Sequence, residues 1–187
     1  MADPILIPDA TAEPAAYVAA LLRTLGDRDP LEVYEHTAQQ VRRQCQDLDH
    51  DQWTTPMADG EWSALKVVGH LFDVDVVYGF RWRLALTEDT PAYPGYDEKA
   101  WSRLARPTPS QLLDALAGIR LANAAVLRSL DEHDLRRRGV HGEQGSEDVQ
   151  RMIDKVAGHD LAHLDQLGRT IAAVRSRTTT PAPTRLG

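Results

Sequence analysis

Cysteine is nearly absent from this chain, which has a single one, Cys45, among 187 residues. One thiol cannot form an intramolecular disulfide, so a disulfide framework is excluded and a reducing cytoplasm is the expected location. The sequence also lacks any apolar run near the ~20 residues that a membrane helix needs. Its first residues lack the basic-then-apolar pattern of a secretory signal. We therefore expect a cytoplasmic protein that does not enter a membrane.

Positive charge is in short supply. Lys and Arg number 21 against 28 Asp and Glu, which gives a net charge of −7. Because a nucleic-acid surface needs a basic face, no nucleic-acid partner is expected. The one basic run, Arg136 to Arg138, is interpreted as a solvated helix end or loop.

Strand alternation and internal repeats are also missing, and the helical period dominates instead. A short helix is predicted near residues 14–25, ended by Gly26. Four longer amphipathic helices are predicted at about 29–48, 62–86, 108–130 and 146–174. The segment 87–98 is predicted to be loop because of its prolines and glycine. The pattern indicates an all-α fold, a four-helix bundle with a short extra N-terminal helix outside it.

The chain length fits one domain, which we place at residues 1–175. Residues 176–187 contain too little apolar surface to pack, and are predicted to be a disordered C-terminal tail.

Three of the seven histidines lie on predicted core-facing stripes. On the second long helix His70 shares one sector of the helical wheel with apolar residues, and on the last helix His159 and His163 do the same. Residues four apart are neighbours on a helix, so His159 and His163 can bind one ion from one side. The companion residues on the two stripes are Val67, Val74, Val77, Arg81 and Leu84, and Val149, Met152, Val156, Leu167 and Val174.

Three converging imidazoles fit a divalent metal ion. An unpaired imidazole in an apolar core is costly, whereas an ion satisfies three neutral rings at once. Zinc and nickel suit such a donor set, and three protein ligands leave one position open, as in catalytic sites. The alternative is that each histidine is an ordinary core residue bonded to a carbonyl or carboxylate.

Several other side chains are candidates for a site around these histidines. Arg81, Asp73 and Asp160 are candidates for binding substrate or supporting the ligands, or else form surface salt bridges. His141 is either a substitute ligand or a substrate contact at the mouth of the site. Gln166 contacts a ligand or faces water, and Trp62, Tyr78 and Trp82 line a pocket or belong to the core. His36, His50 and His133 are interpreted as an exposed residue, a turn residue and a helix-end residue.

Three blocks of sequence resemble one known family. They are EWSALKVVGHLFDVD (61–75), RLALTEDTPAYPGYDEKAW (83–101) and GVHGEQGSEDVQRMIDKVAGHDLAHLDQL (139–167). In this order they resemble the DinB-like superfamily, and within it the subgroup of metal-dependent hydrolases and bacillithiol transferases. The resemblance covers about residues 15–175. It implies a four-helix bundle, a homodimer, and a metal held by His70, His159 and His163.

The resemblance also implies a reaction class. Related members are thought to activate a low-molecular-weight thiol co-substrate, such as bacillithiol, mycothiol or glutathione, for attack on a small electrophilic substrate. A bound divalent ion lowers the pKa of a thiol, and it does the same for water in hydrolysis. We therefore expect a metal-dependent thiol transferase. The alternatives are a metal-dependent hydrolase and a non-catalytic metal-binding stress protein.

Overall fold

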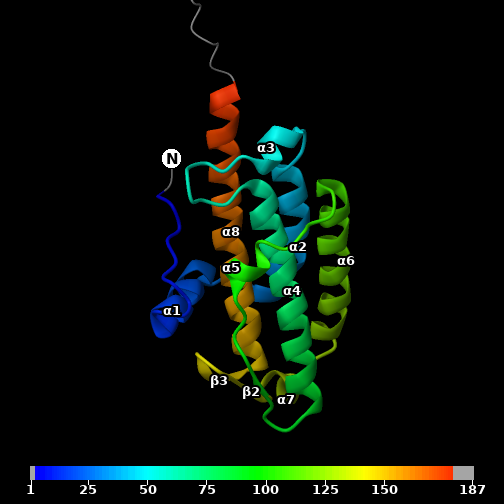
Figure 1. The fold of residues 1–187 in the computed structure, drawn as a ribbon. Coiled ribbons are helices and arrows are strands. Elements are labelled where there is room, and N and C mark those ends of the chain that lie inside the picture. Colours follow the sequence, from blue (N-terminus) through cyan, green and yellow to red (C-terminus); the bar gives the residue numbers. More distant parts are fainter. Residues whose placement is uncertain (1–2, 179–187) are drawn as a thin grey trace, which may run out of the picture.

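Four long helices lie side by side in the structure (Figure 1), a computed structural model that describes residues 3–178. Helices α2 and α4 each pack against both α6 and α8. The predicted all-α four-helix bundle is thereby confirmed. The four helices are α2 (Pro30–Gln44), α4 (Ala64–Thr87), α6 (Pro109–Leu127) and α8 (Val149–Thr178).

Polar caps fix where three of these helices begin. The Asp29 side chain accepts hydrogen bonds from the first backbone N–H groups of α2, and Ser63 accepts one at the start of α4. Thr108 and Gln111 form a reciprocal capping box at α6. These side chains satisfy backbone donors that have no partner inside the helix, and so set the helix starts.

The short helix α1 (Pro14–Leu25) lies outside the bundle, as predicted, and packs against α8 (Figure 1). Gly158 makes this approach possible, because a Cβ atom there would overlap the Leu21 carbonyl oxygen. Gly158 directly precedes His159, so α1 is anchored beside the candidate metal ligands.

A small sheet closes one end of the bundle, and the expectation of a chain without strands was wrong. Strand β1 (Ala92–Tyr93) pairs in parallel with β2 (Arg138–His141), which pairs antiparallel with β3 (Gly145–Asp148). Strands of two to four residues are too short to show a clear alternating pattern. The last helix therefore begins at Val149, since the residues expected to start it belong to β3.

The same helix continues past the predicted end of the domain. Residues 176–178 are helical, in contrast to the disordered tail predicted from residue 176. The remainder of that predicted tail, 179–187, lies outside the described residues.

Three short helices lie outside the five helices predicted from the sequence. They are α3 (His50–Thr54), α5 (Glu98–Trp101) and α7 (Glu132–Leu135). Each begins with an Asp side chain that accepts backbone N–H bonds, which is why so short a helix can form. Helix α5 lies in front of the gap between α4 and α8 (Figure 1).

The core is divided into two apolar clusters along the bundle. One, near the sheet, includes Tyr34, Trp82 and Met152. The other, near α3, includes Leu116 and Leu167. Between them lie polar side chains, among them the three histidines predicted to bind metal: His70 and His159 are buried and His163 is half-buried. Within residues 3–178, no helix has the length and apolar character needed to cross a membrane.

Candidate metal centre

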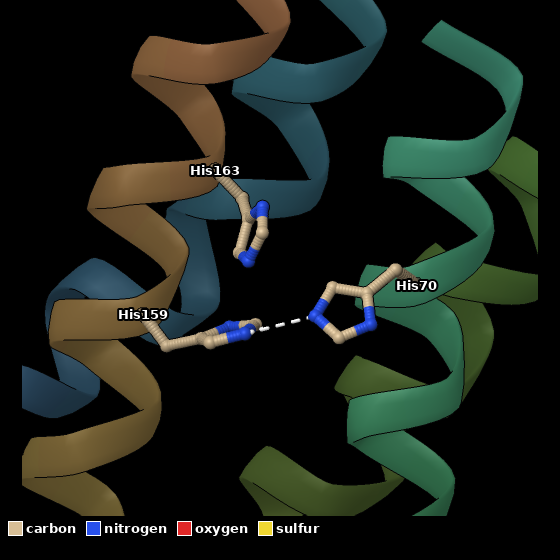
Figure 2. Close-up of side chains that lie close together, drawn as sticks. All are labelled: His70, His159 and His163. Carbon is tan, nitrogen blue, oxygen red and sulfur yellow. Dashed lines mark hydrogen bonds between the residues drawn. The ribbon is translucent and has the colours of Figure 1, made fainter. Parts of the chain in front are cut away.

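The structure brings the three predicted ligands together. His70 extends from α4 toward α8, and His159 and His163 extend from successive turns of α8 toward it (Figure 2). Ring centroids are 4.2 Å apart for the α8 pair, 5.0 Å for His70 and His159, and 4.7 Å for His70 and His163. The helical periodicity of the sequence therefore placed all three on facing surfaces.

The ring nitrogens have a spacing that suits one ion. One nitrogen from each histidine lies within 4.8 Å of the other two. The Nε2 atoms of His70 and His159 are 3.0 Å apart. In a tetrahedral zinc site with Zn–N bonds near 2.05 Å, neighbouring ligand nitrogens lie about 3.3 Å apart. The distance between the Nε2 atoms of His70 and His159 therefore needs to increase only slightly to admit an ion.

Burial keeps the three rings neutral. His70 and His159 are 2% and 5% exposed, and burial lowers the pKa of each well below the ordinary histidine value, with the neighbouring His163 adding to the effect. Burial also lowers the pKa of His163, although Gln166 and Asp160 oppose it. Neutral imidazoles carry the lone pairs that a metal ion needs, so the site is in its binding form at neutral pH.

Gln166 orients His163. Its Oε1 atom lies 2.7 Å from His163 Nδ1. Because an amide oxygen only accepts, Nδ1 carries the proton and the lone pair is on Nε2, the nitrogen on the side of the other two rings (Figure 2). This contact resolves the alternative left open for Gln166: its amide holds a candidate ligand in place.

The chemistry of the donor set fits a divalent ion. Without one, the Nε2 atoms of His70 and His159 share a single hydrogen-bonding proton, and His159 Nδ1 is buried with no partner in the described chain. The alternative interpretation was a core histidine bonded to a carbonyl or carboxylate. In that case His159 Nδ1 would have a hydrogen-bond acceptor nearby, and it has none in the described chain. Unpaired buried ring nitrogens are costly, and an ion at the centre would satisfy the inward-facing ones.

Trp62 forms one wall of the site. Its ring packs edge to face against the His70 ring, with 5.0 Å between the ring centroids. It lies nearly parallel to the His163 ring, with 6.4 Å between the centroids and 14° between the ring planes. Tyr78 and Trp82 both belong to the core cluster near the sheet, and Tyr78 also lines a cavity beside the site.

Glu98 is a site residue that sequence reasoning missed. Its Oε2 atom lies 4.0 Å from His70 Nε2, and in residues 3–178 it is the one carboxylate that comes so near to any of the three rings. Burial raises the pKa of Glu98, and the nearby Asp9 adds to this. The only available signal was an acidic pair, Asp97 and Glu98, at the end of a segment predicted to be loop.

Two connected cavities lead to the histidines. The outer cavity has a volume of about 760 Å³ and is lined by residues of the N-terminal segment, by α5, and by His159 and His163. The inner cavity, about 50 Å³, reaches His159 and is also lined by Arg81, His141 and Lys155. Their shared lining residues include Tyr17, Tyr96, Glu98 and Glu143.

Two of the predicted accessory residues lie in this cavity system. Arg81 and His141 line the inner cavity. Backbone N–H groups of Glu143 and Gln144 donate to His141 Nδ1, and burial with nearby Arg81 and Lys155 lowers the His141 pKa to about 4. His141 is therefore neutral at pH 7 and lies apart from the three-histidine cluster.

The other two accessory candidates are buried carboxylates that pair with arginines. Asp73 accepts two hydrogen bonds from Arg106, and Asp160 accepts two from Arg120. Arg120 also binds Asp75, so one buried cation links α6 to both α4 and α8. These carboxylates hold the helices that carry the histidines, and neither lines the two cavities.

The remaining histidines lie away from the site. His36, His50 and His133 are exposed. His50 is the first residue of α3 and not part of a turn, while His133 lies in α7.

Comparison with known proteins identifies the family. The family model described as the DinB superfamily matches residues 33–167 of this chain. The chain belongs to the DinB superfamily.

Curated relatives share most of the chain. A Bacillus subtilis protein named "Putative metal-dependent hydrolase YfiT" is 31% identical over 146 residues, covering 74% of this chain and 82% of that protein. An Oceanobacillus iheyensis protein with the same description is 32% identical over 120 residues, covering 63% and 70%.

A solved structure agrees with the fold. It is that of YfiT from Bacillus subtilis, described as a probable metal-dependent hydrolase with an unusual four-helix bundle topology. The TM-score is 0.71 at 27% identity, covering 81% of this chain and 87% of that one.

Proposed function

We propose that this protein is a metal-dependent enzyme in which His70, His159 and His163 hold one divalent ion. The observation that carries the proposal is the convergence of three neutral, mostly buried imidazoles beside a cavity of about 760 Å³. A cavity of that size accommodates a small-molecule substrate. The names of the relatives support metal dependence.

Zinc or nickel is the ion proposed. Three nitrogen donors without a thiolate suit borderline first-row ions better than magnesium or calcium, which prefer oxygen. Three protein ligands leave a position for a substrate atom. When bound, such an ion lowers the pKa of a coordinated thiol or water, so that it ionises near neutral pH.

Thiol transfer is the first reaction proposed, and it rests on the family resemblance. The thiol sulfur would attack an electrophilic carbon, forming a C–S bond while the leaving group departs with its electron pair. Glu98 Oε2, beside His70, is placed to accept the proton that the thiol loses. Its raised pKa brings that carboxylate closer to the working range of a proton acceptor.

Hydrolysis is the second candidate, because the relatives are named as hydrolases. The same groups would serve: the histidines as ligands and Glu98 as the acceptor of a proton from water. A third outcome is a metal-binding stress protein without turnover.

One experiment separates the three. Protein loaded with one equivalent of zinc or nickel is incubated with monochlorobimane and bacillithiol, mycothiol or glutathione, and in parallel with a panel of ester and amide substrates. Thiol-dependent turnover that disappears with the metal supports transfer, and ester or amide cleavage that disappears with it supports hydrolysis. Metal binding without any turnover supports the stress protein. If turnover is unchanged after the metal is removed, the proposal is wrong.

The Glu98→Gln variant is the matched test of the proton acceptor. It keeps the size and polarity of the side chain but cannot accept a proton. We expect it to bind metal as the unmodified protein does and to lose about 10²-fold or more in turnover. Equal turnover would remove Glu98 from the proposed reaction.

A further inference from the structure

The inner cavity beside His159 contains a cation that no carboxylate neutralises. Arg81 is 3% exposed, and its Nη2 atom donates to the Pro94 carbonyl oxygen at 2.7 Å. Its guanidinium group lies 5.2 Å and 5.0 Å from the ring centres of Tyr78 and Tyr93. Among the residues that the structure describes, no Asp or Glu oxygen lies within 4.0 Å of it, and its Nε and Nη1 atoms have no acceptor.

Lys155, the second cation that lines this cavity, differs from Arg81 because it has a carboxylate partner. Lys155 is 1% exposed and forms an ion pair with Glu147, and its Nζ atom also donates to Gln144 Oε1 at 2.6 Å. Lys155 is therefore neutralised within the chain, whereas Arg81 is not. A buried charge without a counter-ion is costly, so an anion bound at Arg81 gains more than one bound at Lys155.

A second unused donor belongs to a residue that lines the same cavity. The hydroxyl oxygen of Tyr96 is buried and has no hydrogen-bond partner in the described chain. Tyr96 lines both the inner and the outer cavity, and the positive charge of Arg81 is close enough to oppose the rise in its pKa that burial causes. A phenol and a guanidinium that belong to the lining of one small cavity are complementary to an oxygen anion.

The size and charge of the cavities limit the chemical class of ligand that can bind. About 50 Å³ admits a small planar group, and a planar carboxylate matches the fork of an arginine. The carboxylates of Glu98 and Glu143 line the part that both cavities share, so negative charge lies at the entrance to the inner one. Arg81 lines the inner cavity and not the outer one. An anionic group must therefore pass this entrance to reach Arg81, which favours an anionic group at the end of a larger molecule.

We propose that Arg81 and Tyr96 bind a carboxylate carried by the substrate, leaving the rest of that molecule in the outer cavity against His159 and His163. The substrate class is therefore a small carboxylic acid. This inference rests on the proposed function, because a substrate presupposes an enzyme. The binding of the carboxylate does not itself require the metal.

The test uses the metal-free full-length protein labelled with ¹⁵N, with acetate as the probe and acetamide as its neutral counterpart. Backbone amide signals of residues that line the inner cavity are followed by NMR at constant ionic strength. We expect saturable shifts with acetate and none with acetamide. Arg81→Gln should raise the acetate Kd about tenfold or more, since hydrogen bonds to a charged partner are lost.

Tyr96→Phe is the second variant and removes a hydroxyl that has no partner. It should raise the acetate Kd severalfold without lowering the unfolding midpoint, whereas a purely structural role would change the midpoint and not the Kd. Arg136→Gln, at an exposed arginine on α7's C-terminal side, is the matched control and should leave the acetate Kd unchanged.

Equal shifts with acetamide, or an acetate Kd unchanged in Arg81→Gln, would overturn the inference. Zinc binding by the same proteins is measured separately. A protein that binds acetate through Arg81 but no zinc would contradict the proposed function alone, and one that binds zinc but not acetate would contradict this inference alone.

Discussion

Replacing Arg120 with methionine should destabilise the protein strongly, because Arg120 is the only cation between two buried carboxylates in the described core. Arg120 donates to Asp160 at 2.5 and 2.8 Å, to Asp75 at 2.8 Å and to the Tyr34 carbonyl oxygen at 2.9 Å. Arg120 is 2% exposed and Asp75 and Asp160 are fully buried. Removing one partner of a buried ion pair costs about 3–5 kcal/mol. That is a large share of the ~5–15 kcal/mol that stabilises a typical domain.

The loss should also depend on pH, with a sign set by Asp75. Burial, opposed by Arg120, raises the pKa of Asp75 to about 7. A folded pKa above the unfolded value means that the contribution of Asp75 is fully present below about pH 4 and is lost as pH rises through about 7. Without Arg120 the pKa rises further. The difference between the unmodified and Arg120→Met proteins should therefore be larger at pH 8 than at pH 5.

Chemical denaturation at pH 5 and pH 8, with far-ultraviolet circular dichroism as the signal, measures both effects. The exposed Arg128, which pairs with Glu35, supplies the control, and Arg128→Met should leave the denaturation midpoint unchanged. A loss below about 1 kcal/mol at pH 8, or an equal loss at both pH values, would refute the argument from uncompensated buried charge.

Three further outcomes are expected. Gly158→Ala should lower the unfolding midpoint and loosen α1, because its Cβ atom would overlap the Leu21 carbonyl oxygen; limited proteolysis within α1, compared with Gly118→Ala at an open position, checks this. Cys45 should react with a thiol reagent only on unfolding, since burial raises its pKa to about 12 and leaves about one thiol in ten thousand ionised at pH 8; rapid labelling of the folded protein would contradict it. Light scattering at micromolar concentration should give twice the 20.8 kDa of one chain, as the family resemblance implies, and a mass of one chain would contradict the dimer.

The helices and the histidine cluster could be predicted because both depend on local periodicity. A residue's face on a helix follows from its spacing, so the sequence alone assigns His70, His159 and His163 to core-facing stripes. Their capping residues, such as Ser63 and Thr108, are equally local signals.

What could not be predicted depends on contacts between distant segments. Glu98 approaches His70 because the chain between β1 and α6 folds back and places the one-turn helix α5 in front of the gap between α4 and α8 (Figure 1). Arg120 lies on a leucine-rich helix, and nothing in its neighbours indicates that it binds Asp75 and Asp160 from two other helices. Asp160 was a candidate for the site because it lies near the edge of the stripe that carries His159 and His163, yet its carboxylate binds Arg120.

Metal content of single histidine variants tests the central claim most directly. Elemental analysis after dialysis against zinc should find one ion per chain in the unmodified protein. His70→Ala, His159→Ala and His163→Ala should each lose it while remaining helical, because losing a ligand lowers affinity by more than the ~10–100-fold typical of a residue that only supports a ligand. His36→Ala and His50→Ala, at exposed positions, should retain one ion. If His70→Ala keeps one ion per chain while the two α8 variants lose it, the three histidines are not one site, and the account of the metal centre is contradicted.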